Sequence, residues 1–332
     1  MPAFLDTAGE GLSIESSLPW VMDLIAEGAA GELRLSDPSA ASVKVRVEAE
    51  RRSFDTSGWR LLARGAWERN GELVLENACT AGFDLHVSCG SDHAELTYRW
   101  RPPRRDRAAA RVLRSRFHLL ARALLIQYPA LWWAGTRGRA PLHASGCAAG
   151  RSTPMLTASS GVGRSTLLLA ELRSGGRATG DNLAVGDGTA VWGLVEPLRV
   201  EGAGGRRMPH GRHEAPMPDR VEMLVPDSVV VLERAHPGDE SSAQAREATL
   251  TPCDAHTAAR SLVTSTYQAG ELRRFWQFAA YLSAATGRGP AHPPVTDVAS
   301  AFASRLPCFR LSFARTPGAC LSDLLDIVEV AA

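Results

Sequence analysis

The segment from residue 154 to residue 173 constrains the fold of this chain more than any other. An apolar stretch, Pro154–Ala158, is followed by a turn rich in serine and glycine and then by an apolar run at 165–173. This order predicts a strand, a loop and a helix. Gly161 and Gly163 permit backbone angles that other residues avoid, so the loop can direct N–H groups toward an anion at the helix N-terminus.

The loop approximates the phosphate-binding pattern of glycine, four residues, glycine, lysine, and serine or threonine. Ala158 replaces the first glycine, and Arg164 replaces the lysine with a longer, planar and forked cation. Ser165 stands where a hydroxyl ligates Mg²⁺. A Ser/Gly turn before a helix also forms as ordinary N-cap chemistry, and the segment alone leaves both interpretations open. The predicted nucleotide-binding residues are Ser159, Ser160, Gly161, Val162, Gly163, Arg164, Ser165 and Thr166.

The residues before this segment predict two further regions. Residues 1–105 form a β-rich module, in which Val43, Val45 and Val47 alternate with polar residues and Asn70-Gly71 marks a hairpin. Residues 106–137 form a helical connector, with a helix over 107–128 that ends at Pro129. Its apolar stripe from Leu113 to Tyr128 is typical of core. The strands expected in the first module are 32–36, 43–48, 59–64, 73–75, 84–88 and 94–100.

From residue 138 to residue 332 the pattern is α/β. Strands are expected at 141–148, 154–158, 177–180, 183–185, 190–194, 228–232 and 308–313. Helices are expected at 165–173, 254–263, 271–285, 297–305 and 321–328, and a loop at 201–218.

Composition excludes several classes of function. The chain has 332 residues, of which 45% are hydrophobic and 22% charged, with a net charge of +1. We therefore expect no nucleic-acid partner. No two of the six cysteines have C-x-x-C spacing, which disfavours a zinc knuckle or redox pair. We expect no signal peptide and no membrane span, and hence a cytoplasmic protein. Lys44 is the only lysine among 37 basic residues. The chain therefore uses arginine almost everywhere, and this bias alone can explain why arginine stands at position 164 in place of the lysine of the phosphate-binding pattern.

The order of motifs across 138–328 resembles the C-terminal domain of HPr kinase/phosphorylase and its stand-alone relatives. His143 falls at the family's strand histidine, and 158–166 at its P-loop. Asp181 and Asn182 fall at the family's Asp-Asp pair, with asparagine at the second position. Residues 229–233 and 307–311 resemble later family segments. The resemblance implies a P-loop fold of the PEP-carboxykinase/HPr-kinase type, with a β-rich N-terminal module.

The resemblance also implies an activity, the transfer of a phosphoryl group from ATP or GTP, with Mg²⁺, to a serine hydroxyl of a peptide or protein. Biosynthesis of modified peptides is one setting that the resemblance implies. Asp181, His143 and Arg164 would be catalytic, and Ser165, Asp181 and Asn182 would hold the metal. From the residues alone, Asp181 is equally a turn or cap residue, and His143 equally a buried structural histidine.

Two further interpretations remain open. Because Ala158, Arg164 and Asn182 all depart from the family pattern, the chain is alternatively a catalytically silent nucleotide-binding scaffold. A peptide-binding module without nucleotide is the third possibility, and a homo-oligomer is left open. The basic cluster at 206–213 closes over phosphates, binds an acidic peptide, or is a solvated, mobile loop.

Overall fold

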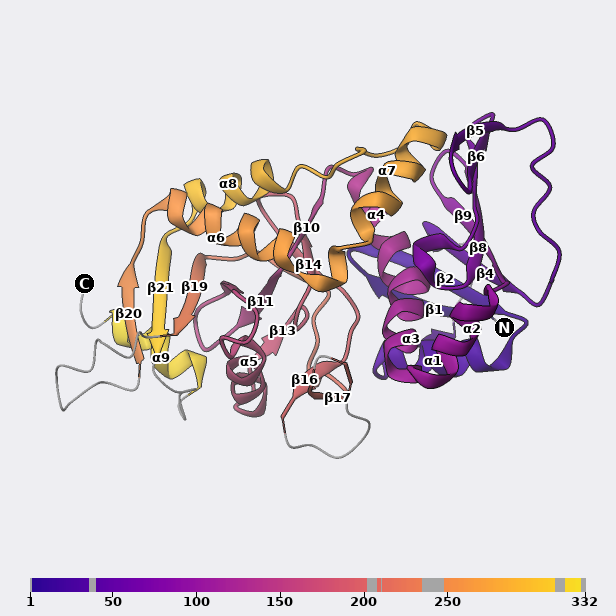
Figure 1. Cartoon of the computed structure of the whole chain (residues 1–332). Helices are drawn as coiled ribbons and strands as arrows, with labels where there is room; N and C mark the ends of the chain where they lie inside the picture. Colours follow the sequence, from indigo (N-terminus) through magenta and orange to yellow (C-terminus); the bar gives the residue numbers. More distant parts are fainter. Residues whose placement is uncertain are drawn as a thin grey trace. The chain divides into compact units, whose positions relative to one another are not determined.

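The protein forms two compact units. A computed structural model describes residues 2–35, 40–201, 208–209, 211–234, 248–313 and 320–329. The first unit contains residues 1–138, 201–214 and 271–293, and the second contains 139–200, 215–270 and 294–332. The first unit therefore includes the helical connector and two later segments that the sequence analysis assigned to the α/β region. Helix α7 (Phe275–Thr286), orange in Figure 1, lies with the indigo and magenta elements of this unit.

The first unit is built on a nine-stranded sheet of order β3-β1-β2-β4-β9-β8-β7-β6-β5. All its neighbouring strands are antiparallel except the β2–β4 and β4–β9 pairs, which are parallel. The strands are β1 (Ala3–Thr7), β2 (Glu10–Ser16), β3 (Arg34–Leu35), β4 (Val43–Glu48), β5 (Arg60–Ala63), β6 (Ala66–Arg69), β7 (Glu72–Leu75), β8 (Phe83–Cys89) and β9 (Ala94–Trp100).

Two local predictions for this sheet are confirmed. Val43, Val45 and Val47 are buried while their neighbours on β4 are not, because successive side chains of a strand point to opposite faces. Asn70 and Gly71 have φ of 52° and 83° and join β6 to β7, as a two-residue hairpin turn requires. The predicted strand at 32–36 is reduced to β3, and its Ser36 lies outside the described residues.

Helices cover this sheet. α1 (Pro19–Ala29) was not expected within a β-rich module. α2 (Arg104–Val112), α3 (Arg114–Arg122), the π-helical turn η3 (Ala123–Gln127) and α4 (Tyr128–Gly135) follow β9.

The prediction that Pro129 ends the helix is wrong: Pro129 lies in the first turn of α4, where a missing N–H costs little. The 3₁₀ turns are η2 (Ala78–Thr80) in the first unit and η4 (Gly270–Leu272) at its boundary with the second.

The second unit contains a six-stranded sheet of order β13-β11-β12-β19-β21-β20. Its central strands β12, β19 and β21 are parallel, and the others are antiparallel to their neighbours. Every residue of β12 is buried, which is typical of a strand covered on both faces. The strands are β11 (Ala144–Ala148), β12 (Pro154–Ala158), β13 (Arg177–Ala178), β19 (Ser228–Arg234), β20 (Ala248–Pro252) and β21 (Cys308–Phe313).

A smaller antiparallel sheet, of order β10-β14-β15-β18, lies beside it. The single strand predicted at 141–148 is wrong, because the chain changes sheet at His143. Residues before His143 pair in this smaller sheet, and residues after it pair in the larger one. The strands are β10 (Ala140–Leu142), β14 (Ala184–Gly186), β15 (Val191–Gly193) and β18 (Met223–Leu224); β16 (Leu198–Val200) and β17 (His213–Ala215) form a two-stranded ribbon.

Four helices flank the larger sheet in two pairs, α5 with α9 and α6 with α8 (Figure 1). Their bounds are α5 (Arg164–Arg173), α6 (Ala255–Gln268), α8 (Val295–Arg305) and α9 (Leu321–Glu329). The chain is thus a mixed α/β protein. None of the helices in the described ranges combines the length and apolar character that crossing a bilayer requires.

Candidate functional site

The predicted phosphate loop connects β12 to α5. β12 ends at Ala158 and α5 begins at Arg164, so Ser159–Gly163 forms the turn between them. Gly161 and Gly163 have φ of 84° and 119°, in the region that disfavours any other residue. Ala158 is not among the described residues with positive φ, so its methyl group causes no strain where the phosphate-binding pattern has glycine.

Ordinary N-cap chemistry does not explain the serines of this turn. The N-cap of α5 is Gly163, and no side chain caps the helix. The carbonyl of Gly163 accepts hydrogen bonds from the N–H groups of Thr166 and Leu167, both at 3.1 Å. Ser159, Ser160 and Gly161 are exposed. The exposed turn therefore leads into a helix N-terminus with no side-chain cap among the described residues, and such a terminus attracts anions through its N–H groups and dipole.

The side chain of Arg164 points into the protein. It is only 7% exposed, although it opens α5 directly after an exposed turn. Its Nη1 donates to the carbonyl of His143 (2.9 Å), and its Nη2 lies 2.9 Å from His143 Nε2. Nη2 also contacts the carbonyl and Oδ1 of Asn182 at 3.2 and 3.3 Å. Three residues predicted separately, His143, Arg164 and Asn182, thus form one buried polar cluster.

His143 Nε2 has two polar neighbours. Arg164 Nη2 lies 2.9 Å from it and Asn182 Oδ1 lies 3.0 Å from it. A guanidinium group only donates and an amide oxygen only accepts, so the tautomer of the imidazole decides which of the two is its hydrogen-bond partner.

Asp181 and Asn182 are adjacent, but their side chains have different partners. Asp181 is fully buried, and its Oδ2 accepts the N–H of Arg199 at 3.0 Å. Its Oδ1 is buried and accepts no hydrogen bond within the described part of the chain. A buried carboxylate oxygen without a donor is costly. Asp181 Oδ1 is therefore available to accept a hydrogen bond or to ligate a cation.

The backbone of this turn is held by a residue that the sequence analysis missed. Glu196 is buried, and its Oε1 accepts the N–H groups of Asn182 and Leu183 at 2.7 and 2.8 Å. The available signal was a single glutamate within the apolar run Leu194–Leu198, since a charge there needs internal donors. Glu196 positions the Asp181–Asn182 turn.

The three predicted metal ligands, Ser165, Asp181 and Asn182, differ in how well their surroundings suit a bound cation. Asp181 fits, because one of its oxygens is available. Asn182 Oδ1 faces the guanidinium of Arg164, which repels a cation at that atom. Ser165 is buried in the first turn of α5. Within the described ranges no three His, Cys, Asp or Glu side chains gather as a metal site; Mg²⁺ held largely by phosphates and water needs only one or two carboxylates.

The basic cluster at 206–213 is only partly described. Residues 206, 207 and 210 lie outside the described residues. Arg212 pairs with Glu201, with 3.6 Å between Nε and Oε1. The cluster belongs to the first unit, whereas the phosphate loop belongs to the second.

No protein-family model matches this chain, and no curated protein matches it significantly.

Proposed function

We propose that this chain is a cytoplasmic phosphotransferase of the HPr kinase-like class, which uses ATP or GTP with Mg²⁺ and phosphorylates a serine hydroxyl of a peptide or protein. The observation that carries the proposal is the unit formed by β12, the glycine turn 159–163 and α5. A strand, a turn with two glycines at positive φ and an uncapped helix are the parts from which phosphate-binding loops are made.

In the proposed reaction the protein's role is to hold the nucleotide phosphates, Mg²⁺ and the substrate hydroxyl in position. The N–H groups of the turn would hold the nucleotide phosphates, with Ser165 and Asp181 as the protein ligands of Mg²⁺. When bound by these residues, Mg²⁺ would supply positive charge next to the transferred group. Asp181 Oδ1 would also be the acceptor for the proton of the substrate hydroxyl. Glu196 and the Arg199 N–H hold the backbone of this turn in place. Because Asp181 is fully buried, the substrate hydroxyl and Mg²⁺ would reach Oδ1 only after the side chains that cover it move.

Binding through the turn is tested with two glycine variants at the opposite ends of α5. Gly161 and Gly175 have similar φ of 84° and 93°, and a Cβ on either would meet no atom within 4 Å. Gly161→Val and Gly175→Val therefore impose a similar backbone strain. We expect Gly161→Val to weaken Mg²⁺–ATP and Mg²⁺–GTP binding at least about tenfold in calorimetry, and Gly175→Val to leave it unchanged.

Equal binding by both variants would contradict the proposal. No measurable nucleotide binding by the wild-type chain would do the same. Circular dichroism spectra of the two variants check that each remains folded.

The burial of Arg164 favours a second candidate, a catalytically silent nucleotide-binding scaffold. Its guanidinium is engaged by His143 and Asn182, and to reach a phosphate it would have to leave hydrogen bonds worth about 1.5–3 kcal/mol each. The two candidates differ in transfer. Labelled γ-phosphate appearing on serine-containing peptides supports the kinase, and nucleotide binding without any transfer or hydrolysis supports the scaffold.

A further inference from the structure

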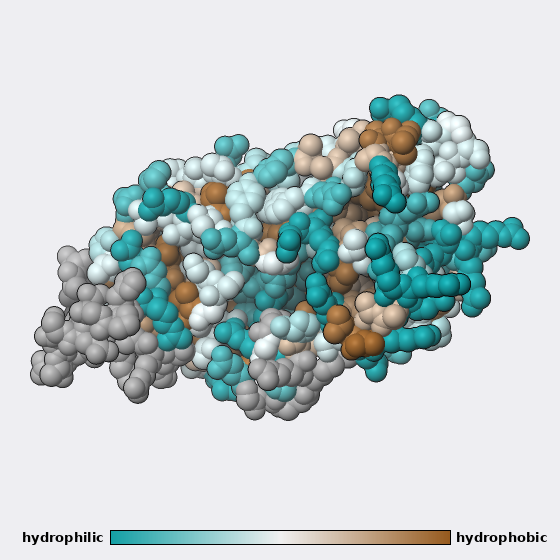
Figure 2. All heavy atoms as spheres, viewed as in Figure 1, coloured by the Kyte–Doolittle hydropathy of each residue, from teal (hydrophilic) through white to brown (hydrophobic). Residues whose placement is uncertain are grey.

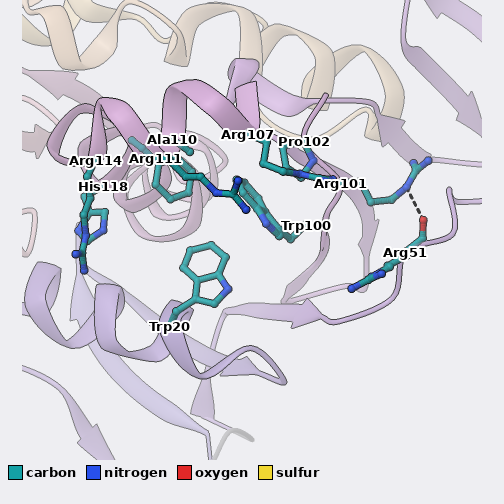
Figure 3. A pocket seen from close by; sticks show the side chains of 11 residues that line it. Trp20, Arg51, Trp100, Arg101, Pro102, Arg107, Ala110, Arg111, Arg114 and His118 are labelled. Atoms are coloured by element: carbon teal, nitrogen blue, oxygen red, sulfur yellow. Dashed lines mark hydrogen bonds between the residues drawn. The ribbon is translucent and has the colours of Figure 1, made fainter. Parts of the chain in front are cut away.

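The first unit contains a large open pocket remote in sequence from the phosphate loop. Its volume is about 960 Å³, and it is lined by side chains from α1, α2, α3, the end of β9 and the loop after β4. Five arginines and three aromatic residues dominate the lining (Figure 3). Figure 2 shows hydrophilic side chains gathered over α2 and α3. We name this feature the arginine–aromatic pocket.

One of the five arginines is already neutralised. Arg101 forms an ion pair with the buried Asp84, and its Nε donates to the carbonyl of Arg51 at 2.8 Å (Figure 3). The other four, which are exposed, form no ion pair with any described residue, and no carboxylate lines the pocket. They are Arg51, Arg107, Arg111 and Arg114.

Arginines elsewhere on the same unit occur both paired and unpaired. Arg46, Arg60 and Arg99 pair with glutamates, whereas Arg52 and Arg64 are exposed and form no ion pair with any described residue. The pocket differs in that four such arginines surround one hollow whose lining contains no carboxylate. Four like charges around one pocket repel one another, and an anionic ligand relieves that repulsion. Arginine also binds carboxylates in a bidentate manner.

The aromatic residues form an apolar floor. Trp20 and Trp100 meet edge to face with ring centroids 5.3 Å apart, and Phe117 lies 5.2 Å from Trp100. All three are half-buried, and the fully buried Phe83 packs behind Trp100 at 4.8 Å. A floor of this kind offers an anchor site for an apolar side chain, as at the centres of protein interfaces.

The arginine spacing indicates an extended ligand. Arg107 and Arg111 lie one turn apart on α2, about 6 Å along its axis. Arg114 begins α3 after Leu113, whose φ of −106° and ψ of 50° are not helical. All three arginines line the pocket. Alternate side chains of an extended peptide repeat every ~7 Å, so two carboxylates can reach this row.

We propose that the arginine–aromatic pocket binds an extended acidic peptide segment, with two carboxylates shared among Arg107, Arg111 and Arg114 and an aromatic or branched apolar side chain on the floor. This inference goes beyond the proposed function and does not rest on nucleotide binding. Single-stranded nucleic acid is disfavoured, because Trp20, Trp100 and Phe117 pack against one another in a cluster. Base stacking needs a row of open ring faces along the groove.

The test is fluorescence anisotropy on the full chain with a labelled ten-residue peptide in which glutamates flank a central phenylalanine. Three comparison probes are used: the same peptide with glutamine for glutamate, the same peptide with alanine for phenylalanine, and ten-nucleotide oligothymidine. We expect the acidic aromatic peptide to bind most tightly, and its affinity to fall as salt rises from about 50 to 500 mM.

Two charge reversals on the same helix provide the matched control. Arg111 lines the pocket, whereas Arg105 is 84% exposed, pairs with Asp106 and lies outside it. Both are exposed, so neither Arg111→Glu nor Arg105→Glu disturbs packing. We expect Arg111→Glu to weaken binding at least about tenfold and Arg105→Glu less than about twofold.

Three outcomes would overturn the inference. They are equal loss in both variants, equal binding of the glutamine peptide, and tighter binding of oligothymidine than of the acidic peptide.

Discussion

At the scale of single residues, Arg164 decides how the candidate site is interpreted. A lysine at this position would present a compact charge to a phosphate, whereas the forked guanidinium reaches two partners at once. It contacts both the carbonyl and the ring of His143, and it also contacts Asn182. The substitution of lysine by arginine and the asparagine at position 182 therefore act together. An aspartate at position 182 would form an ion pair with this guanidinium.

Replacing Arg164 by lysine tests this coupling. A lysine ammonium cannot bond to the His143 carbonyl and ring in the same way, so we expect Arg164→Lys to lower the free energy of unfolding by about 1–3 kcal/mol. If the kinase proposal holds, the same variant retains or increases phosphoryl transfer, because the freed cation can reach a phosphate. Chemical denaturation and a transfer assay measure the two effects. Unchanged stability would mean that the Arg164 contacts contribute nothing.

At the scale of elements, the Asp181–Asn182 turn depends on a close approach of backbones. Gly193, the last residue of β15, lies so near Thr179 that a Cβ would be 1.7 Å from its carbonyl oxygen. No side chain fits at that distance. β15 therefore passes directly against the segment that leads into Asp181, and Glu196, three residues later, holds that turn by its N–H groups. Residues 193–196 thus contact the backbone on both sides of Asp181: Gly193 lies against Thr179, and Glu196 accepts the N–H groups of Asn182 and Leu183.

Substituting Gly193 by alanine should displace this turn. We expect Gly193→Ala to lower the free energy of unfolding by about 1–3 kcal/mol or more, as overpacking does, and to weaken nucleotide binding. Gly270→Ala is the control, because a Cβ there meets no atom within 4 Å and its φ is not positive. Thermal denaturation and calorimetry compare the two. A Gly193→Ala protein as stable as the control would contradict the close approach.

The segment 107–128, which the sequence pattern predicts as one helix, is exposed in its first half and buried in its second half. α2 has no buried residue, and Leu113 at its end is 50% exposed. From Ala121 onward the segment is buried, and Leu124 accepts a hydrogen bond from the Tyr98 hydroxyl at 2.9 Å. The predicted apolar stripe is therefore core only in its second half. Its first half lines the arginine–aromatic pocket through Phe117.

At the scale of the whole molecule, cysteine thiols in both units make the stability of the fold depend on pH. Cys79 lies in the first unit and Cys147 in the second, and all six cysteines are free. Burial raises the pKa of each of these two thiols from its ordinary 9.0 to about 12. Burial also raises the pKa of the Tyr98 hydroxyl. In each case the folded state keeps a proton that the unfolded chain releases.

Stability should therefore decline in alkali. The contribution of a raised pKa is fully present below the unfolded value of 9.0 and is lost as pH rises toward about 12. We expect the free energy of unfolding to fall across this window and to fall less steeply in Cys147→Ala. Urea denaturation at several pH values measures the slope, and the value at pH 7 gives the separate cost of the substitution. Identical slopes in the two proteins would disprove the role of Cys147.

Local patterns were enough to determine several parts of this protein. The turn between β12 and α5, the hairpin at Asn70-Gly71 and the alternation of β4 follow from glycine positions and short-range periodicity. β9 and β21 begin and end where their sequence patterns do. Each of these features depends on neighbours within a few residues, so a single stretch of sequence contains the information.

Only the tertiary structure decided the rest, because the deciding partners are remote in the chain. His143 divides a continuous apolar run, since β10 and β11 pair with strands of different sheets. Arg164 turns inward because His143 and Asn182 supply acceptors there. The arginine–aromatic pocket joins residues from Trp20 to His118. Hydrogen-bond acceptors, sheet neighbours and burial are properties of the assembled fold, and no short window of sequence contains them.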